Sequence, residues 1–338
     1  MSNEYFDPNT FEPHGLYRTA DEGHYYKWGD ASILVKLSPE NTQFVTNACW
    51  RVTVPAGKSV DFMALSGVDR AYYCTAGHGQ VLFNGEATDL SAGDVVLCGR
   101  GNSLEYKNTG ESDLELMGFS IPAVPEVRID VLTEGYELRL ENLSEETRRA
   151  FGLLTRSEAS NLDQVCRGEA CVMGPDEGES FWQPQPSIGY VAIKTKPDYA
   201  RKNNFGVALQ QLEPGSYVQL HGHVRTTELI VCVKGRGTVY VEGLGVKEFS
   251  PGAIAMVGTR TFHNFSTTGT EEDGEMIVAA LASPTEIGEA LFEIGVRRTP
   301  GEPVPDNIER DMSKLMVLVQ KYGFMLPDVD SGEIGARP

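Results

Sequence analysis

Positively charged residues are scarce in this chain. Its 338 residues include 29 Lys and Arg against 48 Asp and Glu, which gives a net charge of −19 at pH 7. Because binding of a phosphate backbone requires clustered Lys and Arg, this balance argues against a nucleic-acid partner. We expect a solvated acidic surface instead.

Long apolar runs are also missing. No stretch of 18 or more apolar residues occurs, so no membrane-spanning helix and no membrane partner are expected. Residues 1–7 have neither the positive start nor the apolar stretch of a signal peptide, which predicts a cytoplasmic protein. Cysteine is limited to six residues. Cys166 and Cys171 lack the second Cys or His pair of a zinc site, and buried apolar positions are expected for cysteines in a cytosolic chain.

Histidine is equally rare, with six in the chain, but three of them belong to one pattern with a glutamate. His221 and His223 are two residues apart, so in a strand both side chains point to the same face. Glu228 begins an apolar run that predicts a neighbouring strand, and His263 comes from a third. Three imidazoles and one carboxylate suit a divalent first-row metal.

An internal repeat runs through the chain. Sliding the sequence by 158 residues places Gly57 on Gly215 and Gly77 on Gly235. Repeats of this kind indicate a duplicated structural unit. The first copy lacks all four candidate ligands, and in their places stand Met63, Leu65, Arg70 and Leu104. The first unit is therefore predicted to hold no metal.

The spacing of the second copy resembles the first signature block of the cupin superfamily: Gly215, five residues, His221-x-His223, four residues, Glu228, six residues, Gly235. The second block keeps its histidine but has Gly258-Thr-Arg260 where the family has Pro-x-Gly. The resemblance implies an all-β fold of two tandem cupin barrels (double-stranded β-helix or jelly-roll barrels). A few short helices would lie in the linker and at the C-terminus.

Among tandem cupins, the layout resembles the quercetin 2,3-dioxygenase-like group. The similarity rests on total length, on the arm segment 22–29 and on the tail segment 284–295. We expect an N-terminal arm (1–40), an N-terminal barrel without metal ligands (41–125), a linker (126–200) and a C-terminal barrel with the metal site and two helices (201–338). Capping residues predict helices after Ser144, after Ser283 and after Asp306. In the last helix, Ile308, Met312, Leu315 and Val319 form the predicted apolar face.

Strand alternation predicts the wall of the metal pocket. The expected substrate contacts are Tyr217, Gln219, Ile230, Cys232 and Phe265, and for each of them core packing is an equally good interpretation. Arg225 is expected in a surface salt bridge rather than at the substrate. No separate organic cofactor is predicted.

The resemblance implies a metal-dependent dioxygenase acting on an enolic, phenolic or other oxygenated small molecule, with dioxygen as a second substrate. His221, His223, Glu228 and His263 would hold one metal, and Glu228 would also serve as the catalytic proton acceptor. Fe(II) is favoured, while Mn, Ni, Co and Cu accept the same ligands. A redox-neutral enzyme (isomerase, cyclase, lyase or hydrolase) and a non-catalytic binding protein remain alternatives. Many tandem cupins associate, so a homodimer is also considered.

Overall fold

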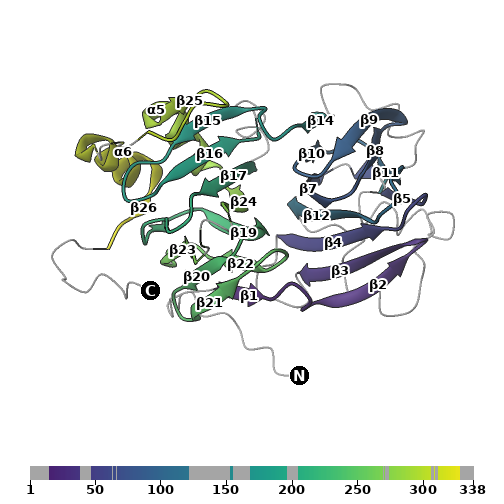
Figure 1. Ribbon diagram of the computed structural model, residues 1–338, viewed down its shortest axis with the longest axis horizontal. Helices are drawn as coiled ribbons and strands as arrows, with labels where there is room; N and C mark the ends of the chain where they lie inside the picture. Colours follow the sequence, from purple (N-terminus) through teal and green to yellow (C-terminus); the bar gives the residue numbers. More distant parts are fainter. Residues whose placement is uncertain are drawn as a thin grey trace.

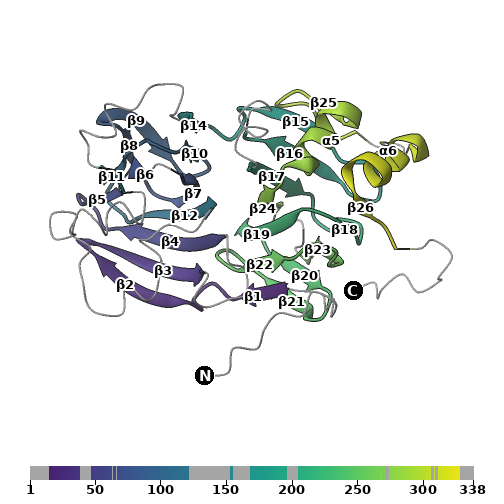
Figure 2. The same cartoon turned by 180° about the vertical axis from the view of Figure 1, so that it is seen from behind.

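Two antiparallel β-barrels, one after the other along the chain, make up the protein (Figures 1 and 2). The computed structural model describes residues 15–38, 47–62, 64–65, 67–121, 153–154, 168–195, 205–268, 270, 274–305, 308 and 311–327. In these residues strands dominate and there are two helices, which confirms the predicted all-β tandem-barrel architecture. Neither helix is long and apolar enough to cross a bilayer.

The first barrel is formed by a large and a small sheet. Its strands are β2 (His24–Trp28), β3 (Ala31–Leu37), β4 (Ala48–Val54), β5 (Ser59–Phe62), β6 (Ala64–Leu65), β7 (Asp69–Ala76), β8 (His78–Phe83), β9 (Glu86–Ser91), β10 (Val95–Cys98), β11 (Leu104–Asn108) and β12 (Leu114–Ile121). The large sheet has the order β14-β10-β7-β12-β4-β3-β2, where β14 is Ala170–Met173. The small sheet has the order β5-β11-β8-β9.

The second barrel repeats this arrangement. Its strands are β15 (Glu179–Trp182), β16 (Gly189–Ile193), β17 (Gly206–Leu212), β18 (Gly222–His223), β19 (Thr227–Lys234), β20 (Gly237–Val241), β21 (Gly245–Phe249), β22 (Ile254–Val257), β23 (His263–Thr267) and β24 (Met276–Ser283). The large sheet runs β1-β22-β19-β24-β17-β16-β15-β25, with β1 at Gly15–Arg18 and β25 at Val296–Arg298, and the small sheet runs β21-β20-β23. Strands β4 and β17 start 158 residues apart, as do β6 and β18, so the sequence offset is also the structural offset.

Each large sheet is buried on both faces. One face of each sheet encloses the core of its own barrel. The other face packs against the large sheet of the other barrel, in a shared core that includes Leu97, Phe119, Leu229 and Met256. Strands covered on both sides carry continuous apolar runs rather than alternating ones. This double burial explains the unbroken run from Leu229 to Val233.

The barrels exchange their edge strands. Strand β1 comes from the N-terminal arm but pairs with β22 of the second barrel, from Gly15 opposite Val257 to Arg18 opposite Ile254. Strand β14 lies before the second barrel in sequence but pairs with β10 of the first. In Figure 1 the purple β1 accordingly lies beside the green strands. Strands β2 and β3, inside the range expected for the arm, and β15 and β16, inside the range expected for the linker, belong to the large sheets.

A buried lysine holds the loop that follows each exchanged strand. Lys36 Nζ donates to the carbonyl oxygens of Thr19 (2.5 Å), Ala20 (2.9 Å) and Glu22 (3.2 Å). At the equivalent position of the second barrel, Lys194 Nζ donates to the carbonyls of residues 174, 175 and 177. Both lysine side chains are fully buried. Each ammonium thus satisfies three carbonyls at a point where the chain passes from one barrel to the other.

Two helices follow the second barrel: α5 (Glu286–Ile294) and α6 (Met312–Tyr322), and α6 leads into β26 (Phe324–Met325). Helix α5 begins later than predicted, with Thr285 rather than Ser283 at the N-cap. Helix α6 begins after Asp311, whose carboxylate accepts hydrogen bonds from the backbone N–H groups of residues 313 and 314. The predicted helix after Ser144 lies outside the described residues. The short strand β13 (Leu153–Leu154), at the end of that segment, is described and pairs with β6.

The later start of α6 corrects part of its predicted apolar face. Met312 is 64% and Val319 is 37% exposed, and Ile308 precedes the helix. Leu315 turns towards the barrel as predicted, and Leu318 lies beside it there.

Candidate metal centre

Four potential metal ligands converge at one end of the second barrel. His223 lies on β18, Glu228 on β19 and His263 at the start of β23, while His221 forms a bridge to His263. One donor atom from each residue lies within 4.8 Å of the other three. Ligands about 2.1 Å from a common ion are at most about 4.2 Å apart. The four side chains would therefore close on one ion by shifts of a few tenths of an ångström.

Backbone carbonyls orient two of the imidazoles. Nδ1 of His221 lies 2.8 Å from the carbonyl oxygen of Gln219, and Nδ1 of His263 lies 3.2 Å from that of Thr261. A carbonyl can only accept, so in both rings Nδ1 carries a hydrogen, and Nε2 is left as the nitrogen that can ligate a metal. In His263 that Nε2 is 3.1 Å from Glu228 Oε2. His223 Nε2, at 3.5 Å from the same oxygen, has no hydrogen-bond partner although the residue is 1% exposed. A buried ring nitrogen without a hydrogen-bond partner is suited to ligate a cation.

The electrostatics favour the protonation states that bind metal. Burial, followed by the neighbouring His263 and His223, lowers the pKa of His221 well below its usual value, and burial also lowers the pKa of His223. Burial alone would raise the pKa of Glu228, but the imidazoles of His223 and His263 beside it outweigh burial and hold that pKa below its usual range. Neutral imidazoles and an ionised carboxylate are the forms that ligate a divalent cation. The cluster could therefore bind a single metal.

The C-terminal strand covers one side of the cluster. Strand β26 pairs with β18, placing Phe324 opposite His223 and Met325 opposite Gly222. The Phe324 ring stacks on His221 with centroids 5.9 Å apart and meets His223 edge-on at 4.5 Å. Two ligands are therefore held in place by a segment that lies about 100 residues further along the chain.

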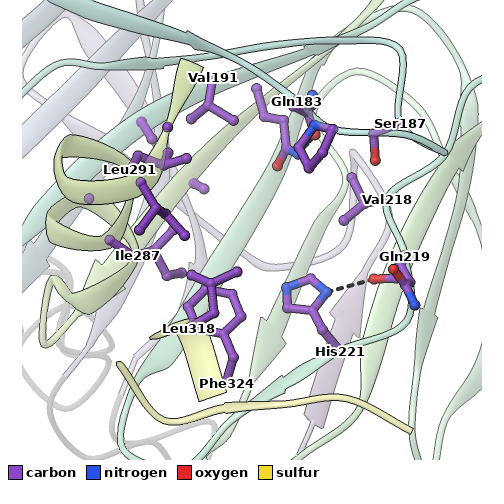
Figure 3. Close-up of a pocket in the computed structure, with 18 of the residues that line it drawn as sticks. Gln183, Ser187, Val191, Val218, Gln219, His221, Ile287, Leu291, Leu318 and Phe324 are labelled. Atoms are coloured by element: carbon purple, nitrogen blue, oxygen red, sulfur yellow. Dashed lines mark hydrogen bonds between the residues drawn. The ribbon is translucent and has the colours of Figure 1, made fainter. Parts of the chain in front are cut away.

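A cavity of about 270 Å³ opens beside the cluster, and both His221 and Glu228 reach it. Figure 3 shows His221 pointing into this space, with Ile287 and Leu291 of α5 on one side and Leu318 and Phe324 below. Most of the lining is apolar, and Gln183, Gln210 and Ser187 contribute polar groups. The cavity has the character of a small-molecule site.

The predicted substrate residues divide into three groups. Gln219 and Phe265 line the cavity. Ile230 and Cys232 face the barrel interior but are sealed in its core, so they do not reach the cavity. Tyr217 is 43% exposed and lies outside it, which corrects the prediction.

A backbone bulge explains why strand alternation wrongly predicts an inward-facing Tyr217. Tyr217 pairs with Ser266 and His221 with His263, so four steps on one strand oppose three on the other. One extra residue in a strand reverses which side chains face inward. Val218 takes the inward position that simple alternation assigned to Tyr217.

Arg225 lies away from the cavity, as predicted. Its guanidinium forms an ion pair with Glu286 at 2.6 Å and donates to the carbonyl of Lys321 at 3.2 Å. It therefore links the loop after the histidines to α5 and α6.

The first barrel has a packed core where the second has its cluster. Leu65 and Leu104 are buried among apolar residues, and the Arg70 guanidinium donates to the carbonyl of Asn102. Aromatic rings fill the same interior, with Tyr72 and Tyr106 centroids 5.2 Å apart. Met63 lies outside the described residues. In the described part of the chain, no metal-ligand cluster other than the one in the second barrel occurs.

Sequence reasoning missed several residues of the cavity. Gln183 and Gln210 belong to no sequence motif, and a glutamine within a predicted strand does not indicate whether its side chain is buried. Phe324 follows the Gly323 that ends α6, but only the pairing of β26 with β18 reveals its contact with the histidines. The apolar spacing of α6 was the available signal for a packing helix.

Comparison with known proteins places the structure in a family. The family model of the cupin domain matches residues 208–280. An oxalate-binding protein of Thermotoga maritima is 31% identical over 93 residues, which is 28% of this chain and 77% of that protein.

Solved structures share the fold over most of the chain. A variant of Bacillus subtilis oxalate decarboxylase matches with a TM-score of 0.54 and 15% identity, covering 90% of this chain and 91% of that one. Procruciferin, the 11S globulin of Brassica napus, matches with a TM-score of 0.57 and 12% identity, covering 79% and 85%. At these identities the two structures support only the tandem-barrel fold. The matched domain and the related sequence establish that this chain belongs to the cupin superfamily.

Proposed function

We propose that this protein is a metal-dependent oxygenase, a dioxygenase that acts on an enolic or phenolic small molecule in the second barrel. The observation that carries the proposal is the combination of four converging donor atoms with an apolar cavity that reaches two of them. A structural metal site is enclosed by its ligands, whereas a catalytic one keeps a side open for substrate.

The protein's own residues supply positioning and proton transfer. His221, His223, His263 and Glu228 would hold one divalent first-row ion, with Fe(II) as our expectation. The bound ion would act as a Lewis acid that lowers the pKa of a substrate hydroxyl and brings dioxygen next to it. The Glu228 carboxylate, ionised and buried, would accept the proton of that hydroxyl. The apolar walls would exclude water from the reacting atoms.

Turnover with and without dioxygen tests this proposal. Metal-loaded protein would be incubated with phenolic and enolic candidates in air and under strict anoxia, with metal content measured in parallel. We expect oxygen uptake matched to substrate loss in air and no product under anoxia. Undiminished turnover without dioxygen would refute the oxygenase assignment.

A redox-neutral cupin enzyme or a binding protein is the second candidate. It is favoured by the sequence relation to an oxalate-binding protein. The described lining of the cavity argues against a small dianion, because Lys314 is its one cationic side chain and Arg225 is engaged with Glu286. Carboxylates are usually held by paired cationic donors.

A further inference from the structure

The cavity beside the cluster has a flat floor made of small side chains. On β17, Gly206 and Ala208 face the cavity, and on β24 they are matched by Ala282 and Ala280. The same register places Ala282 opposite Glu228 on β19. The floor therefore begins at the metal cluster and extends across two strands. Larger residues at these positions would fill the space above the sheet.

Apolar side chains of the two C-terminal helices form the opposite wall. Ile287 and Leu291 of α5 and Leu318 of α6 line the cavity (Figure 3), and so does Leu315 of α6. Leu291 and the floor residue Ala208 pack against the same apolar cluster. A slot between a sheet of alanines and a layer of aliphatic side chains matches a flat apolar body.

A pair of glutamines lies at the end of the floor remote from the cluster. Gln183 Nε2 donates to the carbonyl of Gln211 at 3.2 Å, which fixes the amide so that its oxygen accepts from Gln210 Nε2 at 2.6 Å. Gln183 is 8% exposed. The oxygen and the second N–H of the Gln210 amide remain for a ligand, since no other described residue bonds them.

The sheet register sets the distance between the two polar ends. Gln210 is opposite Val278, which is opposite Cys232, so Gln210 lies two strands across and four residues along from Glu228. With strand spacing and rise per residue, the two Cα atoms are roughly 16 Å apart. Subtracting the lengths of the Gln210 and Glu228 side chains from this separation leaves a gap between their polar ends that suits a ligand of one to two linked rings.

We propose that Gln210, oriented by Gln183, is a specificity-determining residue that binds a neutral hydrogen-bonding group at the far end of a flat, apolar substrate. The near end of that substrate carries the oxygen atoms that reach the metal. Only the part of this inference that concerns the metal-binding end of the substrate rests on the proposed function. It also predicts discrimination against oxalate, which has no apolar body.

Binding titrations under anoxia with Co(II)-loaded protein test the apolar slot. The probes are oxalate, catechol and 4-phenylcatechol, and Co(II) absorption reports occupancy. We expect 4-phenylcatechol to bind at least about tenfold more tightly than catechol because the slot buries its second ring. Ala280→Leu should remove this preference while metal content and catechol affinity remain. Ala208→Leu provides an independent second variant if the first fails to fold.

The far-end contact is tested with 3,4,4′-trihydroxybiphenyl. Its affinity relative to 4-phenylcatechol should fall about five- to tenfold in Gln210→Met, which keeps the side-chain volume but loses the hydrogen bonds. Gln211→Met is the matched control, since Gln211 lies on the same strand and its side chain bonds Glu213 instead of lining the cavity. An unchanged ratio in Gln210→Met, or oxalate binding as tightly as 4-phenylcatechol, would overturn the inference.

Failure of the metal site would be separable from failure of the slot. If the protein bound no metal, the proposed function would fall. Saturable binding of biphenyl-4-ol to the metal-free protein, weakened by Ala280→Leu, would still support the slot, and its absence would overturn it.

Discussion

Replacing Lys194 by Met tests whether the buried lysines secure the exchanged strands. The ammonium donates to three carbonyls at 2.9, 2.8 and 2.6 Å. Hydrogen bonds to a charged group contribute about 1.5–3 kcal/mol each, so the three are worth roughly 5–9 kcal/mol before other costs. Burial lowers the pKa of Lys194 from 10.5 to about 8, which corresponds to a cost of roughly 3 kcal/mol for keeping it charged. Met removes both contributions, and the net loss in free energy of unfolding is about 2–6 kcal/mol.

Urea denaturation followed by tryptophan fluorescence measures this loss at pH 7. Lys58→Met is the control, because Lys58 forms an exposed ion pair with Asp30 at 3.2 Å and should change the free energy of unfolding by less than about 0.5 kcal/mol. Lys36→Met should behave like Lys194→Met, since Lys36 binds its loop in the same way. A loss below about 0.5 kcal/mol for Lys194→Met would refute the reasoning.

Further predictions concern pH, the metal and the cavity. The pKa of Lys194 is lower in the folded state, so the unfolded protein binds more protons between pH 8 and 10.5. The contribution of Lys194 to the free energy of unfolding should therefore rise with pH in this range and disappear as the pH falls through 8. Urea titrations at pH 7.5 and 10 should show a smaller rise in Lys194→Met than in the unmodified protein. His223→Ala should weaken metal binding by more than about 100-fold in competition with a chelator, and near-stoichiometric metal in the purified variant would contradict the assignment. Phe324→Ala should lower stability by about 1–3 kcal/mol and loosen the metal, visible in thermal melts with and without metal. Tyr217→Ala should leave ligand affinity unchanged, because the side chain lies outside the cavity.

The sequence contained the repeat and the ligand set because both depend on local spacing. The His221-x-His223 pattern and the run after Glu228 map onto β18 and β19, and the same offset relates β6 and β18. Such features follow from residues close together in the chain, so one sequence suffices to find them.

The pairing of strands that lie far apart in the chain could not be predicted from local spacing. The partners of β1 and β14 lie in the other barrel, and no local periodicity records which sheet an edge strand joins. The bulge between Tyr217 and His221 was missed for a related reason, because its extra residue is defined only against the partner strand. The amide contact of Gln183 with Gln210 likewise depends on two strands that are separated in sequence.

The exchange of β1 and β14 has a consequence for the integrity of the protein. A backbone cut after β12 and before β13 would give two fragments, each holding an edge strand that completes the other's large sheet. Backbone pairing at both edges and the shared apolar core would keep the fragments together. The tandem protein is thus organised like a dimer whose two halves exchange edge strands within one chain. The half that lacks metal ligands would then be needed for the other half to keep its edge closed, which gives it a role that involves no chemistry.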